Sequence, residues 1–375
     1  MKLKTPYYIV YEEKLRRNVE LITQVAQAAH VKIIMAFKAN ALWRTFGLFR
    51  EYGICSTASS VNEMLLANDE LHCKAHTYCP AYTEDTIDAF IKGSSHISFN
   101  SVSQYMRFKD AVFAAKDSVS CGLRINPMCS VIDTDIYNPC SPGSRFGVTA
   151  EQLKELPTGI EGFHFHALCE STSYDLEKVL QAVENQFGAF LPKLKWINMG
   201  GGHLMTRKDY DIKHLVNLLQ SFKKRYPNLE VILEPGSAFC WQTGDLVSSV
   251  VDIVENRGIK TAIVDVSFSC HMPDCLEMPY QPKISQALPQ VDISRPTYRM
   301  GGNSCLSGDF VGDWSFNHEL QRSEELTFED MNHYTTVKTT MFNGIQHPAL
   351  VYQHLDGTIE VLREFTYEDY KSRMS

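Results

Sequence analysis

The sequence lacks the long apolar segments that mark exported and membrane-spanning proteins. Its N-terminal stretch, MKLKTPYYIVYEEKLRRN, contains no apolar core of the kind that a signal peptide requires. No run approaches the length of about 18 apolar residues that a transmembrane helix needs. We therefore expect a cytoplasmic protein with no membrane span.

A disulfide framework is missing as well. The chain has 11 cysteines, an odd number, and their spacing matches no known pattern of disulfide-linked domains. Scattered cysteines of this kind are typical of a reducing compartment, in which thiols stay free. This agrees with the expected cytoplasmic location.

Basic residues are fewer than acidic ones. The 36 lysines and arginines are outnumbered by 44 aspartates and glutamates, which gives a net charge of −8. Such a balance is unfavourable for nucleic-acid binding and compatible with a cationic small molecule. Apolar residues make up 44% and charged residues 21% of the 375-residue chain, so we expect a globular protein with a sizeable core.

Up to about residue 245, short apolar runs alternate with longer amphipathic ones, and no internal repeat is present. The predicted strands are 32–37, 54–57, 75–79, 96–100, 118–126, 161–166, 195–199 and 230–235. The predicted helices are 43–53, 60–71, 83–93, 101–116, 175–191 and 211–227. This alternation predicts an α/β fold, a parallel sheet closed into a (β/α)8 TIM barrel, with a doubly wound open sheet as the alternative.

One irregular stretch interrupts the alternation. Residues 127–147, PMCSVIDTDIYNPCSPGSRFG, are rich in Pro, Ser, Asp and Asn and are too long for a simple connection. Loops of this length in compact domains are usually functional or disordered.

Beyond residue 245, β-branched and aromatic runs replace the helical patterns. These runs are 246–255, 259–268, 296–302, 333–342, 348–355 and 358–365. They predict a second, mostly β domain, and the opening run 5–11 is a candidate to pair with it. The predicted division is a barrel over 12–245 and a β domain formed by 1–11 together with 246–375.

Polar and glycine-rich features fall at the predicted strand ends, which meet on the rim of a barrel where catalytic groups lie. They are Lys38, Arg124, His164, His166, Gly200–Gly202 and Glu234. Lys38 directly follows the apolar run IIMAF. Partial desolvation there lowers the pKa of a lysine and frees its amine to attack a carbonyl, although a snorkelling or ion-paired lysine is the alternative.

The glycines after the seventh strand predict a phosphate site. Gly200, Gly201 and Gly202 can present backbone N–H groups, and barrels hold phosphate at the loops after strands seven and eight. A plain turn is the alternative. A lysine that binds a carbonyl, together with glycines that hold a phosphate, indicates pyridoxal 5′-phosphate.

Glu234 and the two histidines fit the same cofactor. A carboxylate beside the pyridine nitrogen keeps that nitrogen protonated and strengthens the ring as an electron sink, and an internal salt bridge is the alternative for Glu234. His164 and His166 point into the barrel, where one imidazole can stack on the cofactor. An H-x-H metal pair competes with this interpretation, but no further histidines and carboxylates at strand ends complete a metal site, so no metal is expected.

With these residues in place, the chain resembles the alanine racemase-type, fold-type III family of pyridoxal-phosphate enzymes. Within it, the chain is similar to the family of carboxynorspermidine/carboxyspermidine decarboxylases. The motifs that carry the resemblance are HFHALCE (164–170), NMGGGHLMTRKDYD (198–211), CHMPDCLEMPY (270–280), CLSGDFVGDWSF (305–316) and HYTTVKTTMFNG (333–344). The resemblance covers nearly the whole chain and implies a homodimer with shared active sites.

The resemblance also implies roles for individual residues. Its cofactor-binding positions correspond to Lys38, Arg124, His166, Gly200, Gly201, Gly202, Glu234, Gly236 and Tyr334. Lys38 would be linked covalently to the cofactor, and His166 would stack on its ring. Cys305 of the partner subunit would donate a proton after carbon dioxide leaves, and Asp274 would bind the cationic tail of the substrate.

The chain departs from the family pattern at one position. Ornithine-type relatives carry Arg after the EPG motif and the carboxynorspermidine group commonly carries Glu, whereas this chain has Ser237. A hydroxyl group cannot bind an ammonium group as a carboxylate does. Asp309 or Asp313 is the expected compensating acid at the far end of the substrate.

The expected activity is the decarboxylation of carboxynorspermidine, carboxyspermidine or both, which yields norspermidine or spermidine in polyamine biosynthesis. One alternative is another enzyme on the same scaffold: a diaminopimelate, ornithine or arginine decarboxylase, or an amino-acid racemase. The other is a non-catalytic pyridoxal-phosphate-binding protein, against which the large β domain and Cys305 speak. A metal hydrolase is a more distant alternative.

Overall fold

The computed structural model describes residues 3–115, 119–132, 138–278 and 280–375. The chain divides into two compact units, Asn18–Phe239 and a discontinuous unit of Met1–Arg17 with Cys240–Ser375. Positions 116 and 118, at the ends of two predicted elements, lie outside the described residues, as do 133–137 of the predicted irregular stretch.

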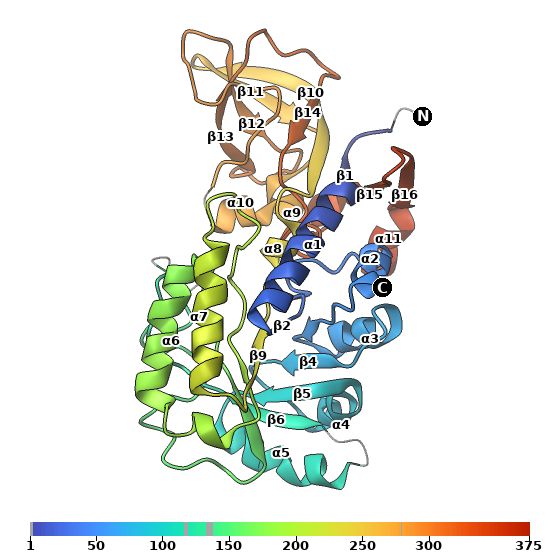
Figure 1. Ribbon diagram of the computed structural model, residues 1–375. Coiled ribbons are helices and arrows are strands. Elements are labelled where there is room, and N and C mark those ends of the chain that lie inside the picture. Colours follow the sequence, from blue (N-terminus) through green and yellow to red (C-terminus); the bar gives the residue numbers. More distant parts are fainter. Residues whose placement is uncertain (1–2, 116–118, 133–137, 279) are drawn as a thin grey trace. The chain divides into compact units, whose positions relative to one another are not determined.

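The unit Asn18–Phe239 is a parallel (β/α)8 barrel, as the alternation predicts (Figure 1). The strands are β2 (Lys32–Ile33), β3 (Thr57–Ala58), β4 (Ala75–Tyr78), β5 (Ser94–Phe99), β6 (Ser120–Arg124), β7 (Ile160–His164), β8 (Trp196–Asn198) and β9 (Glu230–Leu233). They pair in the order β2-β9-β8-β7-β6-β5-β4-β3. An isolated parallel bridge between Met35 and Ser56 joins the two ends of this order and closes the ring, which excludes the open sheet.

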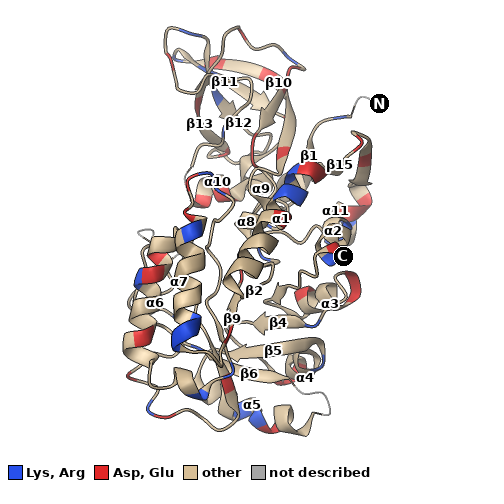
Figure 2. Cartoon of the chain, in the orientation of Figure 1, with Lys and Arg blue, Asp and Glu red and all other residues tan. Residues whose placement is uncertain are grey.

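Helices form the outer layer of the barrel, because each parallel connection must cross over the sheet. They are α1 (Glu12–Ala29), α2 (Phe46–Glu51), α3 (Val61–Glu70), α4 (Glu84–Gly93), α5 (Val102–Ala114), α6 (Ser173–Phe187) and α7 (Ile212–Arg225). Helix α3 begins with a side-chain cap, in which the Glu63 N–H donates to the Ser60 hydroxyl at 3.2 Å. Figure 2 shows charges of both signs on the outer helix α6 and basic residues on the outer helix α7.

The strands supply the inner layer. Phe163 of β7 lies on the helix side, with its ring centroid 5.9 Å from that of Phe187 in α6. Both side chains are fully buried. None of the helices in the described ranges combines the length and hydrophobicity that a membrane span needs.

Three predicted elements are shortened near the seam where the ring closes. The predicted strand 32–37 forms β2 and then only the bridge at Met35. Of the predicted strand 54–57, only Thr57 is part of the observed strand β3, which ends at Ala58. The predicted helix 43–53 is split into a 3₁₀ turn, η1 (Trp43–Thr45), and α2. Apolar content alone does not reveal where a strand stops pairing and turns.

The second unit contains an eight-stranded mixed sheet. Its strands are β1 (Tyr7–Tyr11), β10 (Gly244–Asn256), β11 (Ile259–Val264), β12 (Thr297–Gly301), β13 (Phe310–Ser315), β14 (Glu325–Phe328), β15 (Ala349–Gln353) and β16 (Ile359–Arg363). Their order is β13-β12-β11-β10-β1-β15-β16, with β14 paired to β10. The opening strand β1 pairs antiparallel with β10 and parallel with β15, which confirms that it joins this sheet.

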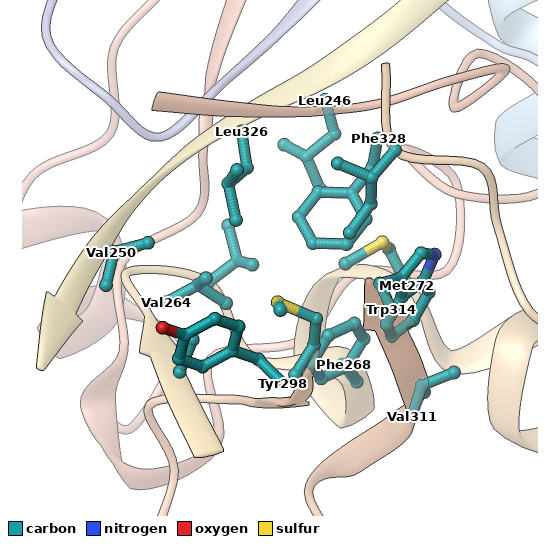
Figure 3. Close-up of a cluster of buried hydrophobic side chains, with 14 of the residues drawn as sticks. Leu246, Val250, Val264, Phe268, Met272, Tyr298, Val311, Trp314, Leu326 and Phe328 are labelled. Carbon is teal, nitrogen blue, oxygen red and sulfur yellow. The ribbon is translucent and has the colours of Figure 1, made fainter. Parts of the chain in front are cut away.

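Apolar side chains from strands far apart in the sequence form the core of the second unit (Figure 3). Trp314 and Phe328 pack there with Leu246 and Met272. The buried indole of Trp314 donates its N–H to the Pro282 carbonyl at 3.2 Å, so its polar atom is satisfied. Short helices α9 (Phe268–His271), α10 (Pro273–Glu277) and α11 (Tyr367–Ser372) complete this unit.

One of the β-rich runs forms no strand. Residues 333–342 are turns and irregular chain, and Tyr334 has a left-handed φ of 56°. The Thr335 hydroxyl donates a hydrogen bond to the Met331 carbonyl, a local contact that is typical of turns and not of strands. The place beside β10 is taken by β14, which the sequence pattern did not predict. Threonine-rich composition favours strands only where a partner strand is available.

Candidate active site

A cavity of about 300 Å³ opens where the barrel strands end. Its lining includes Lys38, Tyr78, Arg124, Phe146, His164, His166, Gly201 and Glu234. These residues come from the C-terminal ends of β2, β4, β6, β7, β8 and β9 and from the irregular stretch after β6. Five residues predicted from isolated strand ends, Lys38, Arg124, His166, Gly201 and Glu234, therefore lie around one space.

Lys38 faces His166 across this cavity. The Lys38 Nζ lies 3.3 Å from the His166 Nε2, and the Gly201 N–H donates to the His166 Nδ1 at 3.0 Å. Burial, followed by the charge of Lys38, lowers the pKa of His166 well below its ordinary value, so the ring is neutral. Because Nδ1 is an acceptor, the neutral ring carries its proton on Nε2, which points at the lysine.

The lysine is held in a state suited to nucleophilic attack. Its side chain is accessible from the cavity, although protein surrounds it on the other sides. This burial, together with the Arg124 guanidinium, lowers the pKa of Lys38. The uncharged amine can accept the hydrogen bond from the His166 Nε2–H, and only the uncharged amine can attack a carbonyl carbon.

Arg124 is fixed between two aromatic rings. Its guanidinium carbon lies 4.5 Å from the ring centroid of Tyr78 and 4.4 Å from that of Phe146. Its Nη2 donates to the His166 carbonyl at 3.3 Å. Burial lowers the pKa of Arg124, but a guanidinium stays charged at physiological pH. It therefore places a permanent positive charge beside the cavity and constrains the backbone at His166.

Glu234 is the acid of the site. Burial raises the pKa of its carboxyl to about 7, against the hydrogen bond from the Asn198 amide to its Oε1. Its Oε2 lies 3.6 Å from the Nε2 of His164. Near neutral pH this carboxyl can therefore hold a proton or release it to a basic nitrogen placed beside it.

His164 lies at the cavity, as its place at a strand end predicts, although the sequence assigned it no definite role, and Asn198 is a part of the site that the sequence did not indicate. His164 is 3% exposed, and neither of its ring nitrogens makes a hydrogen bond to another described residue. Burial and the Arg124 charge lower its pKa well below the ordinary value. No group of three or more His, Cys, Asp or Glu side chains in the described part of the chain is arranged to hold a metal ion.

The glycine loop is shaped by close backbone contacts. A Cβ on Gly201 would lie 2.4 Å from the Glu234 carbonyl, and one on Gly202 would lie 2.3 Å from the Leu168 carbonyl. The Gly200 N–H donates to Asn198 Oδ1 at 2.9 Å, and the Gly201 N–H is taken by His166. Two of the three N–H groups predicted to hold phosphate thus have partners inside the protein.

Gly236 and Ser237 follow Glu234 on the same rim. A Cβ on Gly236 would lie 2.5 Å from the Ala39 Cβ, so glycine lets this turn approach the segment that carries Lys38. Ser237 is partly exposed and begins the short helix α8 (Ser237–Cys240). Neither residue lines the cavity itself.

The other predicted site residues lie in the second unit. Asp274 accepts a hydrogen bond from the Lys338 ammonium at 2.9 Å, and Glu277, one turn further along α10, contacts the same ammonium. Cys305 is exposed, and its backbone N–H donates to the Asn343 side chain at 2.8 Å. No sequence pattern predicted that Lys338 would bind Asp274.

Asp309 has a different environment from the one expected. Its side chain is 4% exposed. It accepts hydrogen bonds from the Ser269 N–H at 3.1 Å, the Ser304 N–H at 3.1 Å and the Ser304 hydroxyl at 2.6 Å. These contacts favour a role in holding the loop around Cys305 over the predicted contact with substrate.

The cavity fits pyridoxal 5′-phosphate in three respects. It presents an amine of lowered pKa, an acid able to share a proton with a ring nitrogen, and a wall that only glycine can form at position 201. The two unpartnered nitrogens of His164 offer further hydrogen-bonding capacity beside Glu234. The fixed guanidinium of Arg124 suits an anionic ligand.

Comparisons with known proteins agree with this fit. The sequence model described as "Pyridoxal-dependent decarboxylase, C-terminal sheet domain" matches residues 10–332. The chain therefore belongs to the pyridoxal-dependent decarboxylase family and is a decarboxylase of that cofactor class. A non-catalytic binding protein is not supported.

Within this class, the similarity is to decarboxylases of carboxylated polyamines. The chain is 45% identical over 374 residues to carboxyaminopropylagmatine decarboxylase of Synechocystis sp., covering 99% of this chain and 96% of that protein. It is 38% identical to carboxynorspermidine/carboxyspermidine decarboxylase of Campylobacter jejuni, covering 99% of each. The crystal structure of carboxynorspermidine decarboxylase from Campylobacter jejuni, complexed with norspermidine, has a TM-score of 0.89 at 37% identity and covers 99% of this chain and 100% of that chain. The resemblance predicted from the motifs is confirmed.

Proposed function

We propose that this protein decarboxylates carboxynorspermidine, carboxyspermidine or both, yielding norspermidine or spermidine. The observation that carries the proposal is the full-length similarity to the carboxynorspermidine/carboxyspermidine decarboxylase of Campylobacter jejuni. The cavity supports it, because Lys38, His166 and Glu234 supply the amine, the oriented imidazole and the acid that decarboxylation requires. These relatives favour a polyamine substrate over diaminopimelate, ornithine or arginine.

Different residues would bind different parts of the cofactor. Pyridoxal phosphate, when bound, supplies a ring that accepts the electrons left on the substrate as carbon dioxide departs. Lys38 would hold the aldehyde carbon, and His166 would lie against the ring. Glu234 Oε2 would hold a proton at the pyridine nitrogen, while Asn198 keeps Oε1 engaged. Gly201 leaves room for the cofactor along the cavity wall, and Arg124, Gly200, Gly202, Gly236 and Tyr334 complete the proposed set.

Proton delivery is assigned to Cys305. The thiol is exposed in its own unit, and the Asn343 side chain fixes its backbone. In the proposed homodimer, Cys305 of the partner subunit would protonate the substrate carbon from which carbon dioxide has left. Loss of this proton donor would slow protonation of that carbon, and therefore product formation, more than it affects substrate binding.

The cationic tail of the substrate needs carboxylates. Asp274 and Glu277 lie one turn apart on α10 and already bind the ammonium of Lys338. Their ability to bind one ammonium group supports Asp274 as the tail ligand, with Ser237 as a secondary contact. Substrate would then compete with Lys338 for these two carboxylates.

Carboxyaminopropylagmatine is the second candidate substrate. It is favoured by the 45% identity to the Synechocystis enzyme. Its planar guanidinium group can donate two parallel hydrogen bonds to a single carboxylate, a geometry that an ammonium group does not provide. Ser237 in place of the expected Glu leaves room for a tail group larger than an ammonium.

The deciding experiment compares substrates on the purified holoenzyme. Release of carbon dioxide is measured with carboxynorspermidine, carboxyspermidine, carboxyaminopropylagmatine, diaminopimelate, ornithine and arginine, and products are identified by mass spectrometry. The proposal predicts the highest kcat/KM with a carboxylated triamine. A higher value with carboxyaminopropylagmatine would replace it by the second candidate, and a higher value with a simple amino acid would refute both.

A further inference from the structure

A second group of reactive side chains lies at the end of the barrel opposite the cavity. Lys32 begins β2, Cys55 lies two residues before β3, and Cys73 lies two residues before β4. All three mark N-terminal ends of neighbouring strands, whereas the cavity is built from C-terminal ends. The decarboxylation described above uses none of them.

The two thiols are in direct contact. The Cys73 S–H donates a hydrogen bond to the Cys55 sulfur, and the Ser56 N–H donates to the Cys73 sulfur. Their backbones are neighbours, because the His76 N–H donates to the Ser56 carbonyl at 3.0 Å in the β3–β4 pairing. The β3–β4 register places Thr57 opposite His76, so Cys55 and Cys73 lie one residue out of register at the start of this pair of strands.

The environment of Cys55 favours its thiolate. The hydrogen bond from Cys73 and the charge of Lys32 lower the pKa of the Cys55 thiol, although it is half-buried against Trp196. Lys32 is anchored by His76, with its Nζ 3.1 Å from the His76 Nε2, and the His76 ring stacks on His96 at 4.0 Å.

The two histidines do not compete with the lysine as cations. Burial lowers the pKa of His76 well below its ordinary value and that of His96 to about 4. Both rings are therefore neutral near pH 7, and Lys32 is the cation that acts on Cys55. Both cysteines are partly exposed, so a small reagent can reach the pair.

We propose that Cys55 and Cys73 form a reactive dithiol site that exchanges with small-molecule disulfides. The Cys55 thiolate attacks one sulfur of a disulfide such as oxidised glutathione, forming a mixed disulfide and releasing one thiolate. The Cys73 sulfur then attacks the Cys55 sulfur, forms the Cys55–Cys73 bond and releases the second thiolate, which takes up the Cys73 proton. Overall, two protein thiols and one small disulfide give one protein disulfide and two small thiols.

Peptide mapping of the wild-type holoenzyme tests this proposal directly. The protein is incubated with oxidised glutathione, its remaining thiols are blocked, and the digest is analysed by mass spectrometry. We expect a peptide linked through Cys55 and Cys73 that disappears after treatment with dithiothreitol. Glutathione adducts on other cysteines with no such linked peptide would overturn the proposal.

The rate of alkylation at pH 6 tests the thiolate. At that pH an ordinary thiol of pKa about 8.5 is almost wholly protonated, whereas a thiol of lowered pKa keeps a larger thiolate fraction. After allowance for its weaker nucleophilicity, Cys55 should react with iodoacetamide roughly tenfold faster than an ordinary accessible thiol. In Cys73→Ala the hydrogen bond is lost, and the rate at Cys55 should fall by most of this factor.

A matched control uses a cysteine near the other end of the barrel. Cys129 is also partly exposed, and it lies in the stretch that follows β6. Cys129→Ala should leave the alkylation rate of Cys55 unchanged. An equal loss of rate in Cys129→Ala and Cys73→Ala would show that Cys73 has no specific influence and would refute the dithiol site.

Discussion

At the scale of single residues, Lys38 shows why a charged side chain follows a buried apolar run. The chain turns out of β2 at the cavity, where burial lowers the pKa of Lys38 and so favours the uncharged amine that can attack a carbonyl. The neutral His166 Nε2–H, fixed by the Gly201 N–H, is positioned to donate to that amine.

Lys38→Ala should purify without the visible absorbance of the bound cofactor and should lack decarboxylase activity. The reason is that the only amine lining the cavity from β2 is removed, so the aldehyde has no covalent anchor there. Absorption spectra before and after addition of pyridoxal phosphate provide the measurement. Lys32→Ala, at the opposite end of the same strand, is the control and should keep the band. An undiminished band in Lys38→Ala would remove Lys38 from this role.

The raised pKa of Glu234 predicts a pH-dependent stability of the cofactor-free protein. The folded carboxyl has a pKa of about 7, above its unfolded value of about 4.3, so it binds a proton that unfolding releases between these values. Stability is therefore lost as pH rises through this range. Relative to Glu234→Gln, the wild type should lose about 2 to 3 kcal/mol between pH 5 and pH 8.

Urea unfolding of both cofactor-free proteins at the two pH values provides this measurement. Other titrating groups are shared by the two proteins and cancel in the comparison. Parallel pH profiles for wild type and Glu234→Gln would mean that the carboxyl does not carry its proton near neutral pH.

The chemistry of individual residues predicted part of the site but not the side chains that hold those residues in place. Lys38, Arg124, His166 and Glu234 could be predicted because strand ends converge in any barrel. Asn198, which holds Glu234, and Phe146, which stacks on Arg124, could not, because neither has a distinctive spacing. Their roles depend on contacts across strands or loops that no local pattern records.

At the scale of elements, the loop between β8 and α7 depends on close backbone approach. Gly201→Ala would place a Cβ 2.4 Å from the Glu234 carbonyl, so β8 and β9 must shift apart. We expect a destabilisation of about 1 to 3 kcal/mol and at least a tenfold loss of cofactor affinity. Thermal unfolding and titration with pyridoxal phosphate measure the two effects.

Gly47→Ala is the matched control for this substitution. Gly47 lies inside α2, and its added Cβ would meet only the Arg50 side chain at 3.7 Å, an ordinary contact. Alanine there should raise stability by up to about 1 kcal/mol and leave cofactor affinity unchanged. If Gly201→Ala behaved like Gly47→Ala, the cavity wall would not require glycine.

Elements with strong periodicity were predicted well, and the elements at the seam of the ring were not. Helix α7 matches its predicted range, 211–227, to within two residues at each end. Helix α6 begins two residues before its predicted range, 175–191, and ends four residues before the end of that range. Strands β2 and β3 are only two residues long, because the ring closes between them through the Met35–Ser56 bridge. The length of such strands is set by the curvature of the sheet and not by the apolar run that contains them.

At the scale of the whole molecule, the proposed homodimer with shared sites predicts complementation between inactive variants. Lys38→Ala and Cys305→Ala should each be inactive or nearly so. In a co-expressed equal mixture, half of the dimers are mixed, and one of their two sites contains both intact residues. About a quarter of the wild-type activity should return.

Activity of the mixed preparation, compared with each variant alone, provides the measurement. A mixture of Lys38→Ala with Lys38→Ala carrying a purification tag is the control and should stay inactive. If no activity returned in the Lys38→Ala and Cys305→Ala mixture, each site would have to be built from a single chain.

The position of β1 in the sheet of the second unit has a consequence for synthesis on the ribosome. Strand β1 is made before both of its partners, β10 and β15, which come more than 200 residues later. At about 5–20 residues per second, this apolar strand waits for roughly ten seconds or more before either partner emerges. During translation its apolar side chains and backbone hydrogen-bonding groups are thus unpaired, and we expect a nascent-chain chaperone to shield them.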